Sequence, residues 1–340
     1  MTRGAVALAS LLVTLSHPAW WVLALASFLV RGGIVAFVLP VVVIPSPLAI
    51  SNMFAPLVVP VALGRIGPEV VALAGVAIAG LLGWLVGGGY LAAAADRALI
   101  RDAHDAAIDE GVAGRRDQAP EAPAGDGAAG QILAARLVTL VPLAVAVGYG
   151  TVAIVQAAYV ELVRPIDVGT PLVLRVATAA ALPIAAIVLA WVLAEVLGGA
   201  AGRRIAIERL DAGDGLRRAA GDLVHRSPST LLLWLATTAI LALLLAGLLA
   251  AGGLAWQRAS DLLTDRTADP LALAIALLSF VAVWVIALVL TGVAAAARTV
   301  VGVFELVRHG SGVPADPGTF GAGAHGRPGD WSVGDGGGSL

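Results

Sequence analysis

The chain has 340 residues, of which 59% are hydrophobic and 13% charged, and its mean hydropathy is +0.93. A soluble domain carries about 45–50% apolar and about 25% charged residues, so this composition excludes an ordinary water-soluble fold. The net charge of −2 and the absence of cysteine exclude a basic nucleic-acid binder, a disulfide framework and a thiolate metal site. We therefore expect an all-α polytopic membrane helix bundle whose partner is the lipid bilayer and not a nucleic acid.

Six apolar stretches each approach the length of about 20 residues that a bilayer crossing needs. They cover residues 18–44, 68–95, 132–160, 171–200, 228–256 and 270–297. Five of them begin at a proline, whose fixed φ suits the first position of a helix: Pro18, Pro68, Pro171, Pro228 and Pro270. The sequence therefore predicts about six transmembrane helices.

The N-terminal segment 4–16 begins like a signal peptide, but the apolar run continues beyond it without a good cleavage site. We expect this segment to be retained. It either lies outside the first crossing or starts that crossing near Arg3.

The arginines predict the orientation, because loops on the cytoplasmic side carry an excess of basic residues. Fifteen of the 21 arginines lie in the N-terminus, the 96–136 loop, the 201–227 loop and the tail. Both termini are therefore expected in the cytoplasm, with the chain in a cell membrane, the inner membrane of a bacterium.

Four regions follow from these boundaries. Residues 1–110 form a membrane hairpin with the N-terminal segment, and 131–309 form a four-helix membrane part. Residues 111–130 are a polar cytoplasmic linker, and the Gly-rich tail 310–340 is expected to be disordered. The proline-rich stretch 45–66 is either a re-entrant segment or an interfacial one.

The second, fourth and sixth stretches end alike. In each, a tryptophan (Trp84, Trp191 or Trp284) precedes an arginine by 13, 13 or 14 residues, with Gly and Ala between. Small residues let helices approach closely in lipid. Either three helical hairpins repeat one plan, or the likeness is an accident of an Ala-rich composition.

Arg31 and Glu195 are the charges expected deepest in the membrane. An arginine at mid-bilayer costs at least ~2.5 kcal/mol, so Arg31 should face the bundle and find an acceptor. Similar depths make Glu195 the candidate partner, as an intramembrane pair that either locks two helices or forms a mid-membrane polar site for transport.

The segment 203–226 alternates arginines with apolar residues and is interrupted by Gly213-Asp214-Gly215, where Asp214 is expected to cap a second short helix. It is either an amphipathic helix on anionic lipid headgroups or an ordinary cytoplasmic loop. The candidate lipid-surface contacts are Arg203, Arg204, Arg209, Arg217 and Arg218.

Three motifs carry a family resemblance: Ile205-Ala206-Ile207-Glu208, then Gly213-Asp214-Gly215-Leu216-Arg217-Arg218, then Leu223-Val224-His225-Arg226. Residues 170–250 resemble uncharacterised bacterial six-helix membrane proteins, similar to the membrane domain sometimes joined to glycerophosphodiester phosphodiesterases. The resemblance implies a six-helix membrane domain. No phosphodiesterase domain accompanies it in this sequence, so it implies no such activity.

No hydrolytic or phosphate-cradling motif occurs, and we expect no catalytic residue, cofactor or metal. The sequence favours a non-enzymatic scaffold or accessory membrane domain, with a membrane protein as partner. A permease or channel-like transporter around Arg31 and Glu195 is the first alternative, and a membrane-embedded enzyme is the second.

Overall fold

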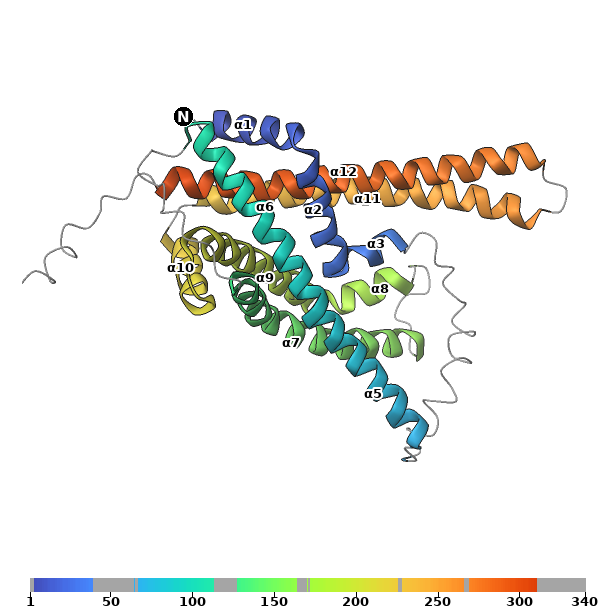
Figure 1. Ribbon diagram of the computed structural model, residues 1–340. Coiled ribbons are helices and arrows are strands. Elements are labelled where there is room, and N and C mark those ends of the chain that lie inside the picture. Colours follow the sequence, from blue (N-terminus) through green and yellow to red (C-terminus); the bar gives the residue numbers. More distant parts are fainter. Residues whose placement is uncertain are drawn as a thin grey trace, which may run out of the picture.

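The structure is a computed structural model that describes residues 3–38, 64, 67–112, 127–163, 170, 172–225, 228–265 and 269–310. All regular elements within these residues are helices, and these residues contain no strand. The expected all-α helix bundle is therefore confirmed. Figure 1 shows the helices α11 and α12 side by side, with α6 crossing them obliquely.

The chain bends by 94° between α1 (Arg3–Ser16) and α2 (Pro18–Phe28). Pro18 lacks the N–H that would extend α1, and His17 before it has a non-helical backbone with φ −120° and ψ 80°. Helix α1 consequently lies across the direction of α2 and packs on α12 (Figure 1).

A second break follows in the π-helical turn η1 (Leu29–Gly33), before the short helix α3 (Ile34–Val38). Gly32 has a φ of 107°, in the left-handed region that L side chains rarely adopt. The described part of the apolar stretch 18–44 is therefore not one straight helix: it breaks at Gly32, immediately after Arg31.

Helix α5 (Pro68–Gly83), the π-helical turn η2 (Trp84–Gly88) and α6 (Gly89–Asp109) together make a helix of 42 residues. None of the residues of α5 is buried. The opposite end of this helix extends well beyond the expected limit at residue 95, because α6 buries Leu99 and Ile100 against its neighbours.

Helix α7 (Ala128–Val163) packs along α9 (Ala181–Glu208), and the short helix α8 (Leu172–Ala179) precedes α9. The break between α8 and α9 lies at Ala180. Three residues later Pro183 can neither donate to the preceding turn nor fit beside it, which favours a break here.

Helix α10 (Ala212–His225) folds back on α9. The turn between them passes through Arg209, which has a φ of 57°. Asp211, and not Asp214 as expected, caps α10: its Oδ1 accepts a hydrogen bond from the Asp214 N–H at 2.7 Å. The expected interruption at 213–215 lies within the first turns of α10, where Gly215 passes close to Ile205 of α9.

The last two helices, α11 (Pro228–Thr264) and α12 (Pro270–Gly310), form a long hairpin. Helix α12 also packs on α1, α2 and α6, so the regions 1–110 and 131–309 share one interior. The repeat tryptophans Trp84, Trp191 and Trp284 lie in η2, which continues into α6, in α9 and in α12. Each of these helices packs on an earlier one: α6 on α2, α9 on α7, and α12 on α11. A shared geometry of these three pairs remains a prediction.

Five described helices are long and apolar enough to cross a membrane, or six if the bent pair α1–α2 is one crossing. This agrees with the prediction of about six crossings, and the protein is an integral membrane protein. The stretch 45–66 lies outside the described residues except for Gly64. Most of the linker 111–130 and the tail beyond residue 310 lie outside them too.

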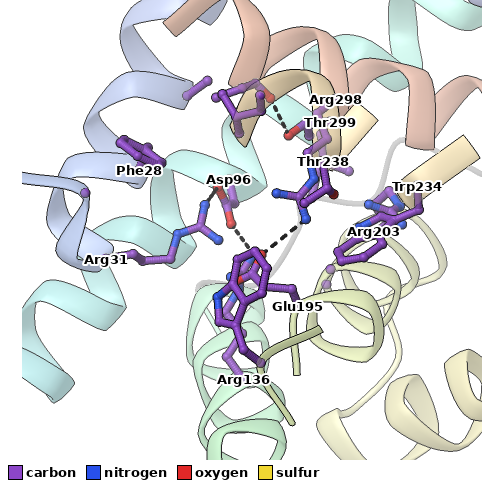
Figure 2. Close-up of a pocket in the computed structure, with 18 of the residues that line it drawn as sticks. Phe28, Arg31, Asp96, Arg136, Glu195, Arg203, Trp234, Thr238, Arg298 and Thr299 are labelled. Atoms are coloured by element: carbon purple, nitrogen blue, oxygen red, sulfur yellow. Dashed lines mark hydrogen bonds and ion pairs between the residues drawn. The ribbon is translucent and has the colours of Figure 1, made fainter. Parts of the chain in front are cut away.

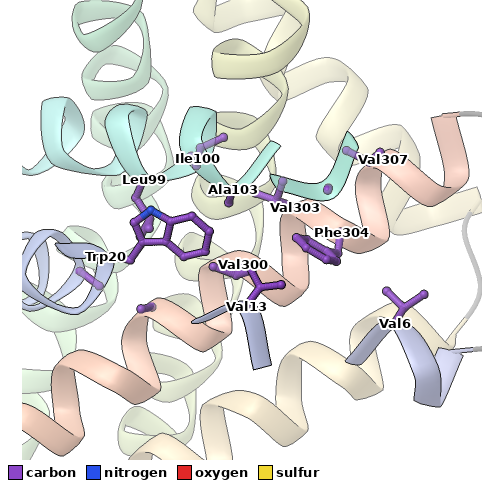
Figure 3. Close-up of a cluster of buried hydrophobic side chains, with 13 residues drawn as sticks. Val6, Val13, Trp20, Leu99, Ile100, Ala103, Val300, Val303, Phe304 and Val307 are labelled. Atoms are coloured by element: carbon purple, nitrogen blue, oxygen red, sulfur yellow. The ribbon is translucent and has the colours of Figure 1, made fainter. Parts of the chain in front are cut away.

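The main apolar core joins α1, α2, α6 and α12 at the end of the bundle where α6 and α12 terminate (Figure 3). Its fully buried side chains include Leu99, Val300 and Phe304. A smaller core joins α7, α9 and α10 through Ile132 and Ile205. These cores hold the helix ends together around the cavity described next.

Candidate functional site: an arginine-rich cavity

A cavity of about 320 Å³ lies between α2, η1, α6, α7, α9, α11 and α12 (Figure 2). This volume falls in the range of small-molecule sites, about 300–1,000 Å³. Six charged side chains from five elements line it: Arg31, Asp96, Arg136, Glu195, Arg203 and Arg298. The sequence places these residues far apart, and the bundle brings them together.

Asp96 of α6 lies at the centre of one side of the cavity, and its side chain is 7% exposed. Its Oδ1 accepts from Arg31 at 3.0 Å and from the Ser27 hydroxyl at 2.6 Å, and its Oδ2 accepts from Arg136 at 2.6 Å. Charge-assisted bonds of this kind are about twice as strong as neutral ones. Asp96 therefore ties α2 and α7 to α6.

Arg31 reaches Asp96 from the break in the first crossing. Its guanidinium also donates to the Ser27 carbonyl at 3.1 Å and to the Ser27 hydroxyl. Because the helix turns at Gly32, Arg31 sits at a helix end and not within a straight apolar helix.

Glu195 of α9 pairs with Arg298 of α12 at 3.3 Å on another side of the cavity. The guanidinium of Arg298 lies over the Trp234 ring, 4.9 Å from its centroid, which is the geometry of a cation–π contact. Arg298 is thus positioned by both a carboxylate and an indole.

Arg203 of α9 makes no ion pair with any described residue. It lies against Gly302 of α12, where an added Cβ would be 2.9 Å from the guanidinium carbon. The four guanidinium groups of the cavity face two carboxylates, which leaves an excess of two positive charges. A cavity with this excess of positive charge attracts an anion.

Two buried polar atoms of the lining have no hydrogen-bond partner among the described residues: the Thr238 hydroxyl and the Nε of Arg136. Thr238 is 9% exposed. A buried donor without a partner costs about 1–3 kcal/mol, and a ligand oxygen in the cavity would remove that cost.

Small residues make the space for the cavity. Gly199 and Gly202 of α9 and Ala295 of α12 belong to its lining, and they come from the small-residue helix ends that the sequence repeats. Longer side chains at these positions would extend into the space between the helices.

The predicted pair of Arg31 and Glu195 is wrong, although both residues line this cavity. Arg31 pairs with Asp96, and Glu195 pairs with Arg298. The prediction compared depths along separate helices and did not consider Asp96 and Arg298. Both line the same cavity and supply the actual partners.

The five arginines expected on the lipid surface have different surroundings. Arg203 lines the cavity, and Arg204 is buried, bonding to Asp222 at 2.8 Å through Nε and to Glu208. These two are therefore not surface contacts. Arg217 and Arg218 are exposed on α10, and each also pairs with an acid. Arg209 occupies the turn before α10.

Sequence reasoning missed Asp96, Arg136 and Arg298 as site residues because each was assigned to the end of a crossing or to a loop. The tryptophan-to-arginine repeat contained a usable signal: Asp96, Arg203 and Arg298 lie within one residue of the repeat arginines or are themselves one. Similar helix ends converge at one depth, so their charges meet.

A separate ion pair joins α7 to α8, where Glu161 and Arg175 lie 3.0 Å apart with both side chains largely buried. Among the described residues, no group of three His, Cys, Asp or Glu side chains could hold a metal ion.

Comparison with known proteins adds no assignment to this geometry. No protein-family profile, no curated protein and no solved structure matches the chain.

Proposed function

We propose that this integral membrane protein is a non-enzymatic protein that binds a small anion, a phosphate or carboxylate group, in the arginine-rich cavity. The observation that carries the proposal is Arg203, a guanidinium without an ion pair in a cavity that already holds two excess positive charges. The proposal favours the permease or channel-like alternative over a passive scaffold.

The composition of the lining supports binding over catalysis. Both carboxylates of the cavity already accept hydrogen bonds from guanidinium groups of the same cavity, so neither is left free for acid–base chemistry. The hydroxyls on the cavity wall belong to Thr238 and Thr299, and the described lining contains no histidine that would activate them.

The arginine asymmetry supports an orientation in which the cavity faces the cytoplasm. Asp96, Arg203 and Arg298 of the cavity directly follow the predicted crossings of α6, α9 and α12, on the side of the loops that hold most of the arginines. An anion would then enter from the cytoplasmic side of a cell membrane.

Binding of inorganic phosphate to the purified protein in neutral detergent tests the proposal, with isothermal titration calorimetry as the measurement. Arg203→Gln should weaken binding about tenfold or more, because a hydrogen bond to a charged group contributes about 1.5–3 kcal/mol and 1.4 kcal/mol is a factor of ten. Since no ion pair of Arg203 is lost, the variant should fold normally.

Arg217→Gln is the matched control, because Arg217 is 84% exposed on α10, outside the cavity. It should leave phosphate affinity unchanged. Absence of saturable phosphate binding by the unaltered protein would overturn the proposal, and so would equal binding by the two variants.

A further inference from the structure

A second cavity adjoins the first and differs from it in chemistry. It has a volume of about 230 Å³ and lies between η1, η2, the start of α6, α7 and α9. Most of its wall is apolar, made by Val30, Trp84, Leu85, Leu133, Leu137, Leu140, Leu143 and Ala194. Its chemistry is suited to a hydrocarbon chain.

The two cavities share Arg31, Arg136, Trp191 and Glu195 as a common wall. The charged groups therefore stand at one end of the apolar space and not around it. An indole at such a boundary presents an apolar ring to one side and an N–H to the other. The combined space is charged at one end and apolar at the other.

The apolar cavity borders the lipid-facing surface of the bundle. Trp84 is 50% exposed, Leu85 38% and Leu140 36%, and all three belong to helices that are apolar enough to span the membrane. A molecule dissolved in the bilayer could reach this cavity sideways, without crossing the cytoplasm.

We infer that the ligand is an anionic phospholipid, with its phosphate among the arginines of the first cavity and the start of an acyl chain in the second. The inference rests on the proposed anion site and adds the class of ligand. A free phosphate ion shares the headgroup chemistry but would leave the apolar cavity unused. The chain of a lipid would also pack against the walls of the second cavity, and these dispersion contacts would add to the binding of the headgroup.

Two variants of α7 separate chain recognition from headgroup recognition. Leu137→Trp adds bulk to a side chain that lines the apolar cavity, whereas Val141→Trp places the same indole at a position whose side chain is 60% exposed on the surface of the bundle. Both variants leave the cavity arginines in place.

Native mass spectrometry of the delipidated protein in neutral detergent would give the affinities for phosphatidic acid and phosphatidylcholine, and calorimetry would give that for inorganic phosphate. We expect the unaltered protein to prefer phosphatidic acid to phosphatidylcholine at least tenfold, and to bind it at least tenfold more tightly than inorganic phosphate. Leu137→Trp should lose most of the advantage over inorganic phosphate, and Val141→Trp should keep it.

The possible failures are distinguishable. If inorganic phosphate binds with the expected Arg203 dependence but phosphatidic acid binds no better, the lipid inference is wrong and the anion site stands. If Leu137→Trp and Val141→Trp behave alike, the chain does not occupy the second cavity and the inference is again wrong. If neither phosphate nor phosphatidic acid binds, the anion site itself is wrong.

Discussion

Asp96 is a single residue that links several helices of the bundle through ion pairs and hydrogen bonds. Its two carboxylate oxygens receive hydrogen bonds from Arg31, Arg136 and Ser27, so one side chain joins three helices. Charged groups within a bilayer are expensive unless they are paired. On this side of the cavity, Asp96 is the carboxylate that compensates the positive charges of Arg31 and Arg136.

Replacing Asp96 with asparagine should destabilise the protein by about 3 kcal/mol, because loss of one partner leaves buried charges without compensation. Two guanidinium groups, those of Arg31 and Arg136, would lose their negatively charged partner. Thermal unfolding in detergent, followed by circular dichroism, measures the change.

Asp105→Asn is the matched control, since the Asp105 side chain is 78% exposed on the same helix. Its melting temperature should equal that of the unaltered protein. Equal stability of the Asp96 and Asp105 variants would contradict the role given to Asp96.

The sequence allowed the residues of the cavity to be recognised in part. Arg31 and Glu195 stand out as single charges within apolar runs, and both do line the cavity. Their partners could not be predicted, because pairing depends on which helices are neighbours and on the depth at which those separate helices end. Both properties belong to the tertiary structure, and neither can be inferred from the local pattern of a single sequence.

At the scale of helices, close approach depends on a few small residues. A Cβ on Gly292 of α12 would lie 2.8 Å from the backbone oxygen of Trp21 in α2. Backbone cannot move aside as a flexible side chain does, so this glycine sets the distance between the two helices. The same pair of helices carries Arg31 and Arg298 to the cavity.

Gly292→Ala should therefore separate α2 from α12 and destabilise the protein by about 1–3 kcal/mol, the usual cost of overpacking. Gly247→Ala in α11 is the control, because no atom lies within 4 Å of its added Cβ. In a helix interior that control should be neutral or slightly stabilising. Thermal unfolding in detergent compares them, and a Gly292 variant as stable as the control would refute the close contact.

Helix starts were predictable and helix ends were not. Pro18, Pro68, Pro228 and Pro270 are the first residues of α2, α5, α11 and α12, as the local chemistry of proline requires. Helices α6 and α12 continue well beyond the last apolar residue of their crossings, because their extensions are buried against α1 and against each other. Packing between distant segments, absent from a local pattern, fixes those ends.

In the whole molecule, the buried apolar cores and the charged cavity lie towards the same end of the helix bundle. Helix α1, the ends of α6 and α12, and α10 with the end of α9 gather there, while the α11–α12 hairpin and α5 extend away from it (Figure 1). If the arginine asymmetry sets the orientation, this end is cytoplasmic.

Single cysteines test that orientation, and the natural absence of cysteine gives a silent background. Thr264→Cys at the end of α11 should react with an impermeant thiol reagent applied to intact cells. Arg217→Cys on the exposed face of α10 should react only after the membrane is permeabilised. Labelling of the α10 position in intact cells would reverse or refute the proposed topology.

The residues that pair around Asp96 are synthesised at different times. Arg31 precedes its acceptor by 65 residues, and Arg136 follows that acceptor by 40. At about 5–20 residues per second, roughly 3–13 seconds separate the first two groups and roughly 2–8 seconds the next two. During each interval a nascent chain holds a charge in or beside the membrane whose partner has not yet been made. Until α7 has been synthesised, the charged side chains of the earlier helices therefore need other polar contacts. Water, lipid headgroups or the insertion machinery can provide them.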